Sequence, residues 1–341
     1  MPEKSRKVLN VYWIAAILLT LLFVVARTVI TLTYLDTEKE LYPADCLPVT
    51  VLHIAIAAVT VFLCTAAFAV QKGSRIDPYA DSAPASSMLT VFSAILSAFT
   101  LVVSLILSAP MLLQTVQGPT AQQALYSTAT LNEFSNVQRV FSVLLCVSII
   151  PSAIYFFCVS SMRRQKNSVF ALLSMCVVLY HAFLIVSTYF DISVAVNSPV
   201  KLFNHIALIF SMLFFLGEAR YYIGMVQPRA YLFFAYPALF LTALSAVPDF
   251  IVNLQKAGGG LSVSLIQCAV QIAFSLYILS RLREFSRVRE HAQNEISDDS
   301  LTTAPKNSAP DESAHLQQSE VPEDAESSDT EPDFDTPDSE V

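Results

Sequence analysis

Residues 88–113 read MLTVFSAILSAFTLVVSLILSAPMLL, a run of 26 residues without one charged side chain. An α-helix rises about 1.5 Å per residue, so a run of this length can cross the roughly 30 Å hydrocarbon core of a bilayer. The run is continuously apolar, whereas a strand of a membrane barrel alternates between apolar and polar residues. This stretch therefore predicts a transmembrane α-helix.

Seven further stretches have the same character. They lie at about 8–35, 47–70, 137–159, 168–190, 200–223, 230–253 and 262–281. Pro151 falls inside one of them, where it is expected to kink the helix. The chain is thus predicted to be an all-α polytopic membrane protein with eight transmembrane helices. Apolar runs repeated in this way exclude a soluble enzyme.

Charge divides the 341 residues into two parts. Only 14% of the residues are charged, against about 25% in a typical soluble protein. Residues 1–289 carry a net charge of +7, and residues 290–341 carry −15. The second part is rich in Ser, Pro, Asp and Glu and cannot bury an apolar core. We therefore expect an eight-helix domain at 1–289 and an acidic, disordered tail at 290–341 that is available to a protein partner.

The basic residues orient the chain. If the N-terminus is cytoplasmic, the inner segments hold fourteen Lys and Arg residues and the outer segments hold four. Short cytoplasmic loops carry such an excess, which places both termini in the cytoplasm. The absence of an Asn-x-Ser/Thr sequence fits a bacterial plasma membrane. The expected partners are the bilayer and its anionic headgroups, and no nucleic acid is expected.

The two halves of the chain resemble each other. Spans 1–4 and 5–8 enter the membrane in the same sense and share local sequences in the same order. Corresponding residues include His53 and His205, Pro110 and Pro248, and Tyr155 and Tyr277. These matches predict two parallel four-helix repeats, at about 8–160 and 168–283, related by an axis along the membrane normal.

Polar residues within the spans gather in the predicted outer half. Intramembrane ionisable groups are costly, so they indicate function by default. They suggest a pocket for a ligand or ion in which Arg27 pairs with Asp249 and His53 faces His205. The alternative is that these groups hydrogen-bond headgroups or water at the interface. The candidate residues are Arg27, His53, His181, Asp191, His205, Asp249, Gln267 and Gln271.

The predicted inner end carries two further groups of charges. Glu218 and Arg220 are interpreted as an interface anchor, together with Tyr221 and Tyr222 of an aromatic belt, or as an inner gate. The last span runs directly into a basic neck. Its arginines Arg281, Arg283, Arg287 and Arg289 are expected to contact anionic lipid headgroups.

The chain lacks recognisable catalytic chemistry. It contains no HExxH, GxSxG, P-loop or dinucleotide-binding motif, and its six cysteines form no CxxC pair. Neither a metal site nor a cofactor is expected, and an enzyme is disfavoured. Two hypotheses of function remain. One is a small-solute or ion transporter or permease with its site in the outer half. The other is a non-transporting membrane sensor or scaffold that acts through its inner loops and tail.

Overall fold

The chain folds into a bundle of α-helices. The computed structural model describes residues 3–36, 41–43, 46–69, 87–116, 129–161, 168–190, 198–225, 227–256 and 262–302. Its helices are α1 (Glu3–Tyr34), α2 (Leu47–Cys64), the short 3-10 helix η1 (Thr65–Ala69), α3 (Met88–Val116), α5 (Ala129–Ser161), α6 (Ser168–Tyr189), α7 (Pro199–Tyr222), α8 (Pro228–Lys256) and α9 (Val263–Thr302).

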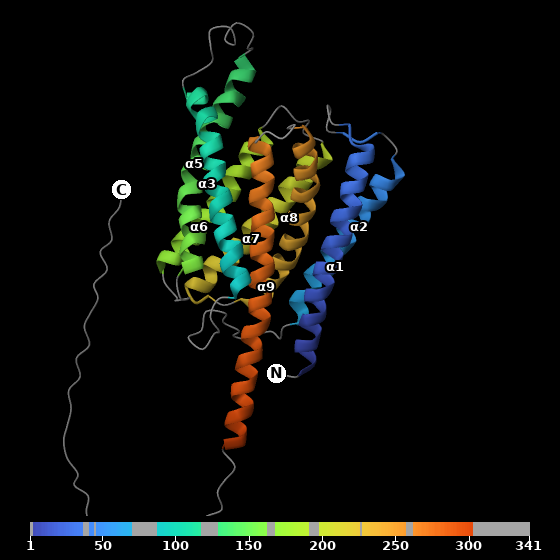
Figure 1. Cartoon of the computed structure of the whole chain (residues 1–341), viewed down its shortest axis with the longest axis vertical. Coiled ribbons are helices and arrows are strands. Elements are labelled where there is room, and N and C mark those ends of the chain that lie inside the picture. The colour runs from blue at the N-terminus through green and yellow to red at the C-terminus, as the bar shows by residue number, and fades with distance from the viewer. Residues whose placement is uncertain are drawn as a thin grey trace, which may run out of the picture. The chain divides into compact units, whose positions relative to one another are not determined.

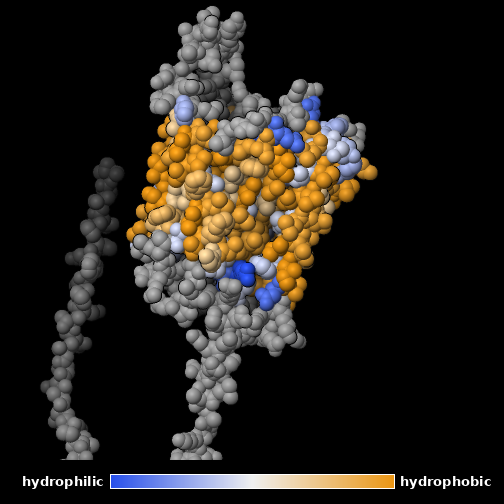
Figure 2. All heavy atoms as spheres, viewed as in Figure 1, coloured by the Kyte–Doolittle hydropathy of each residue, from blue (hydrophilic) through white to orange (hydrophobic). Residues whose placement is uncertain are grey.

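Eight spans within these residues are long and apolar enough to cross a membrane, which confirms the predicted polytopic architecture. They begin and end close to the expected boundaries; the first is Val8–Tyr34 and the last is Val263–Ser286. Apolar residues cover most of the bundle face in Figure 2, and the hydrophilic residues lie mainly near its two ends. Such a band matches the hydrocarbon region of a bilayer.

The spans differ greatly in burial. Only 17% of the apolar window of α1 is buried, against 78% of that of α8. Side chains of α1 such as Val11, Leu18 and Leu22 are more than half exposed, as expected of a helix that faces lipid. The most buried span, α8, therefore forms part of the core.

Neighbouring helices follow two arrangements. The helices α3, α5, α6, α7 and α8 pack each against the next, whereas α1 and α2 pack against each other and against α8. Figure 1 shows α1 and α2 on one flank, α3, α5 and α6 on the other, and α9 running between them. Side chains of α9 contact α3 through Ser280, α5 through Tyr277 and α7 through Gln271. The last span is thus a central one.

A tight turn sets α7 antiparallel to α8. Gly224 has a φ of +78°, which glycine adopts without steric cost. The N–H of Gly224 donates to the carbonyl of Tyr221, and the N–H of Met225 donates to that of Arg220. This pair of bonds is the Schellman motif that ends many helices. Pro228 then occupies the first position of α8, where its missing N–H costs nothing.

Two expectations about organisation are not confirmed. Among the contacts of the described helices, α7 packs against α8, whereas none joins their counterparts α2 and α3, so the two parallel repeats are not confirmed. The helix α9 continues to Thr302, so the first part of the predicted disordered tail is helical. The chain divides into a compact unit at Met1–Asp298 and a second unit at Asp299–Val341. From residue 303 onward the predicted tail lies outside the described residues.

Candidate functional site

The candidate site is built around the buried guanidinium of Arg27 on α1. Pro248 in α8 has no N–H, so the carbonyl of Leu244, four residues earlier, lacks its helical donor. Arg27 donates from Nη1 to this oxygen at 2.8 Å. Within a bilayer every backbone polar group needs a partner inside the protein. Arg27 therefore replaces the donor that the proline removes, and it ties α1 to α8.

The same guanidinium makes two further contacts. Its Nη2 lies 3.8 Å from Oδ1 of Asp249, and its Cζ lies 4.6 Å from the ring centroid of Phe203 on α7. The side chains of Arg27 and Asp249 are 3% and 16% exposed. The separation of the two charged atoms is that of an ion pair and is too long for a strong hydrogen bond. The structure thus brings together the two charges that the sequence suggests as a pair.

Phe203 gathers residues from several helices. The ring of His53 on α2 lies 5.0 Å from it, between centroids, so His53 and Arg27 contact the same side chain. The next residue of α7, Asn204, accepts a hydrogen bond from Nε2 of Gln271 on α9 at 2.8 Å. Side chains of α1, α2, α7 and α8 therefore meet here, and Asn204 links the next position of α7 to α9.

Two hydroxyls of α8 add unused hydrogen-bonding capacity. Thr242 and Ser245 are each 1% exposed, and their hydroxyls have no partner among the described residues. The hydroxyls of Ser97 and Ser152, by contrast, bond to the carbonyl four residues earlier. Spacings of three and four residues place Thr242, Ser245 and Asp249 on one face of α8. Buried polar groups are nearly always satisfied, so these two hydroxyls are exceptions that call for an explanation.

We call this group the Arg27 cluster. It comprises Arg27, His53, Phe203, Asn204, Thr242, Ser245, Asp249 and Gln271. Four of these residues were candidates from sequence, and four were not. Ser and Thr in a helix usually bond to their own backbone, so sequence alone gives them little weight. The signal that could have found Thr242 and Ser245 is their spacing from Asp249.

His53 and His205 do not face each other. His53 contacts Phe203 and lies near Tyr42. His205 bonds through Nδ1 to the carbonyl of Lys201 at 2.6 Å, and its Nε2 lies 3.4 Å from the hydroxyl of Thr188 on α6. The two histidines of the proposed repeat thus contact different helices.

The remaining sequence candidates lie apart from the cluster. His181 is fully buried, bonds to the carbonyl of Val177 and to the hydroxyl of Ser211, and is packed against Phe215 and Phe274. Gln267 is half-buried, and the structure gives it no hydrogen bond to another described residue. Asp191 lies outside the described residues.

A second polar group lies where α9 passes the end of α7. Glu218 is completely buried and receives bonds from Nε of Arg281 at 3.1 and 3.3 Å and from the hydroxyl of Tyr231 at 2.6 Å. Arg281 also bonds through Nη1 to Glu284 at 2.6 Å, and Glu284 accepts the N–H of Ser87 at 2.8 Å. We call these residues the Glu218 network; it joins α7, α8, α9 and the start of α3.

This network changes the interpretation of the neck and of the anchor. Arg281 is 2% exposed and bonded to two carboxylates, so it faces the protein interior rather than lipid headgroups. Tyr221 and Tyr222 are also buried, whereas residues of an aromatic belt lie at the membrane surface. Arg283 is exposed and lies over the ring of Trp13 at 5.7 Å. The side chains of Arg287 and Arg289 are outside the described residues.

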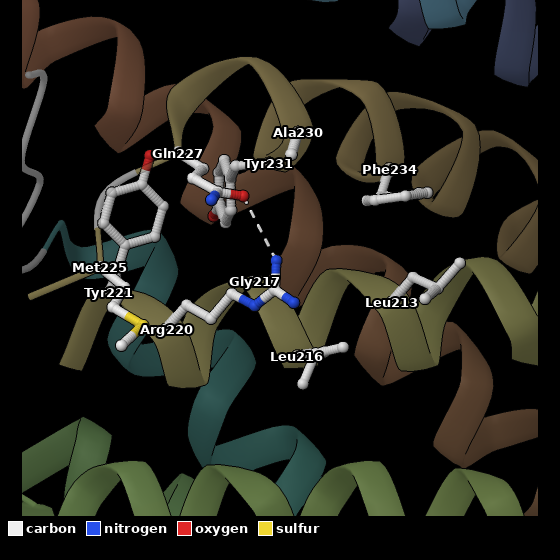
Figure 3. Close-up of a pocket in the computed structure, with 10 residues that line it drawn as sticks. All are labelled: Leu213, Leu216, Gly217, Arg220, Tyr221, Met225, Gln227, Ala230, Tyr231 and Phe234. Atoms are coloured by element: carbon white, nitrogen blue, oxygen red, sulfur yellow. Dashed lines mark hydrogen bonds between the residues drawn. The ribbon is translucent and has the colours of Figure 1, made fainter. Parts of the chain in front are cut away.

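Arg220 is exposed and lines a pocket between α7 and α8. The pocket has a volume of about 230 Å³. In Figure 3, Arg220 reaches across it to Gln227, whose Oε1 accepts a hydrogen bond at 3.3 Å. Glu218, its partner in the sequence interpretation, points instead into the network described above.

Comparison with known proteins adds no functional assignment. No protein-family model, curated protein or solved structure matches the chain. Among the described residues, no three His, Cys, Asp or Glu side chains come together in a way that could hold a metal ion. The geometry of the Arg27 cluster is therefore the best guide to function.

Proposed function

We propose that the chain is a small-solute or ion transporter, or a permease-like protein, whose binding site is the Arg27 cluster. One observation carries this proposal. The buried, unpartnered hydroxyls of Thr242 and Ser245 share a face of α8 with Asp249, which lies 3.8 Å from the buried Arg27. A purely structural ion pair does not need additional free hydroxyls beside it.

The chemistry of the cluster suits a small charged or zwitterionic solute. Asp249 offers a negative charge, Arg27 a positive charge, and the hydroxyls can donate or accept hydrogen bonds. Electrostatic interactions are stronger in a buried environment than in water, so few groups are needed to hold a solute. Pro248 interrupts the backbone bonding of α8 beside the site, and interrupted helices commonly form the solute sites of transporters.

The proposed topology places this site in the outer half of the membrane, with both termini cytoplasmic. The excess of Lys and Arg in the inner segments supports this orientation. We also propose the parallel repeat, in support of which the hydroxyls of the corresponding residues Tyr155 and Tyr277 lie 3.2 Å apart. We also propose that the chain lies in a bacterial plasma membrane. Anionic headgroups contact the neck at Arg283, Arg287 and Arg289, and the acidic tail binds a protein partner.

A sensor is the second candidate, and the Glu218 network favours it. Tyr231 of α8 bonds to Glu218, which bonds to Arg281 of α9. Because α9 continues to Thr302, a shift of α8 on ligand binding would be transmitted to the segment that precedes the tail. The sensor and the transporter share the same ligand site and differ in whether the solute crosses the membrane.

A thermal-shift screen followed by a flux assay tests both candidate functions, the transporter and the sensor. Purified full-length protein is heated with a panel of amino acids, carboxylates and alkali cations. We expect at least one solute to raise the unfolding midpoint of the wild type but not that of Asp249→Asn or Ser245→Ala. Ser97→Ala, which alters a buried serine bonded to its own helix, should respond as the wild type does.

Uptake of that solute into proteoliposomes then decides between the two candidates. Accumulation that Asp249→Asn abolishes supports transport, and binding without uptake supports sensing. If every stabilising solute acts equally on the wild type and on both variants, the Arg27 cluster is not the site.

A further inference from the structure

The pocket between α7 and α8 has walls of two kinds. Arg220 and Gln227 lie at one part of it, and Leu213, Leu216 and Phe234 line another. Leu216 and Leu213 precede Arg220 by four and seven residues on α7, so they lie about 6 and 10 Å farther along the helix axis. The polar side chains of the pocket therefore lie near the end of α7, beside Met225, and its lining toward the middle of the span is apolar.

A glycine helps to form the floor of this pocket. A Cβ atom on Gly217 would lie 3.2 Å from Cδ2 of Tyr231, which is tighter than ordinary van der Waals contact. Without a side chain at this position, the Tyr231 ring can lie close against α7. The neighbouring Ala230 is also small and lines the same pocket.

The charge of Arg220 is available to a ligand. Its side chain is exposed, and the only described group that it bonds is the neutral amide of Gln227, at 3.3 Å. By contrast, Arg27 and Arg281 both lie beside carboxylates. An exposed guanidinium without an acidic partner among the described residues is a ready site for a phosphate or carboxylate group.

We propose that this pocket binds an anionic lipid. The acidic headgroup contacts Arg220 and Gln227, and the upper part of one acyl chain lies against Leu213, Leu216 and Phe234. Both helices have the length and composition of membrane spans, so lipid is the molecule that surrounds this position. The order of polar and apolar walls along the helix axis matches the order of headgroup and acyl chain in a leaflet. This inference does not depend on the transporter proposal.

Lipid bound in this pocket would contact Tyr231, which belongs to the Glu218 network. The ring of Tyr231 lines the pocket, and its hydroxyl donates to the carboxylate that holds Arg281. An occupied pocket restrains Tyr231 and so restrains the contact between α8 and α9. The lipid thus acts as a structural ligand of the bundle core.

Native mass spectrometry of the delipidated full-length protein tests the headgroup contact. The probes are phosphatidylglycerol and phosphatidylcholine with the same acyl chains, and inorganic phosphate as a competitor. We expect one tightly bound phosphatidylglycerol, weaker binding of phosphatidylcholine, and no displacement by phosphate. Arg220→Gln should weaken phosphatidylglycerol binding about fivefold, as expected for one arginine near a headgroup. Arg283→Gln, at an exposed neck arginine outside the pocket, should lower only the weaker, additional lipid binding proposed for the neck and leave the affinity of the tight site unchanged.

A second pair of variants tests the acyl-chain contact. Ala230→Phe fills the pocket and should abolish the tight site, whereas Ile209→Phe places the same ring on an exposed part of α7 and should not. Equal losses in Arg220→Gln and Arg283→Gln, or equal affinity for the two lipids, would overturn the proposal. Displacement by inorganic phosphate would likewise overturn it, because the site would then bind a free anion rather than a lipid.

Discussion

At the scale of single residues, Arg27 makes the most consequential contacts. It satisfies the carbonyl that Pro248 leaves without a donor, approaches Asp249 and lies on the ring of Phe203. The pairing of Arg27 with Asp249 could be suggested from sequence, because both lie at a similar depth in spans with few other charges. The contact of Arg27 with the Leu244 carbonyl could not be predicted from sequence, because it depends on how α1 is placed and rotated against α8.

A double-mutant cycle measures the coupling of this pair. Arg27→Ala leaves Asp249 and the Leu244 carbonyl without this donor and should lower the unfolding free energy by about 3–5 kcal/mol. Asp249→Ala should cost less, because its carboxylate is partly exposed. The double variant should be less harmful than the sum of the two. Additivity within about 0.5 kcal/mol, measured by denaturant titration in detergent, would show that the pair is not coupled.

A second cycle separates the backbone contact from the ion pair. Pro248→Ala restores an N–H that can bond the Leu244 carbonyl within α8. Arg27→Ala should therefore be less damaging in the Pro248→Ala background than in the wild type, by about 1 kcal/mol, the usual net contribution of one hydrogen bond. Pro237→Ala, at the other proline inside α8, is the control and should not change the effect of Arg27→Ala. An unchanged effect in both backgrounds would contradict the role given to the carbonyl.

The histidines show where residue-level prediction fails. His53 and His205 occupy similar positions in similar sequences, yet they contact different helices. A helix that is apolar on all sides carries little information about which face points toward a neighbour. Depth in the membrane can therefore be read from sequence, whereas rotation about the helix axis cannot.

At the scale of the helices, the spans were predictable and their roles were not. Continuous apolar runs defined all eight spans to within a few residues for most boundaries. Burial could have been anticipated in part, since α8 has the lowest mean hydropathy of the eight and is the most buried. Lipid-facing spans must be strongly apolar, whereas an interior span can carry Thr, Ser and Tyr. The window of α9 follows the same trend, with a mean hydropathy of 1.8 and 56% of it buried.

The bond from Tyr231 to Glu218 tests how α8 is held to α9. Tyr231→Phe removes a hydroxyl that donates to a buried carboxylate at 2.6 Å. A hydrogen bond to a charged group contributes about 1.5–3 kcal/mol, so the variant should be destabilised by that amount. Tyr189→Phe is the matched control. Tyr189 is 56% exposed, so this variant should have the unfolding free energy of the wild type. Equal stability of the two variants would remove Tyr231 from the network.

At the scale of the whole molecule, the topology can be tested at two described positions. Met225 lies in the turn between α7 and α8, and Gln255 lies near the opposite end of α8. With the native cysteines replaced, Gln255→Cys should react with a membrane-impermeant thiol reagent in intact cells. Met225→Cys should react only after the membrane is opened. The reverse pattern would invert the proposed orientation and move the Arg27 cluster to the cytoplasmic half.

The architecture of the bundle followed from the sequence only in part. Length and hydropathy predicted eight crossings, because each helical span satisfies its own backbone hydrogen bonds within the bilayer. The two-fold repeat is not confirmed, because α7 packs against α8 whereas, among the contacts of the described helices, none joins their counterparts α2 and α3. Local sequence similarity does not specify which helices become neighbours, since that choice depends on packing across the whole bundle.

The central claim is that the polar face of α8 beside Asp249 is reached by water-soluble molecules from one side of the membrane. Cysteine accessibility at Ser245 tests it most directly, in a background without native cysteines. Ser245→Cys should react with a small impermeant methanethiosulfonate reagent applied from outside. Ala243→Cys, equally deep but rotated about 200° away on α8, should not react. If the two cysteines are equally unreactive from both sides, α8 is sealed protein core and the Arg27 cluster is a structural contact, which contradicts a solute site there.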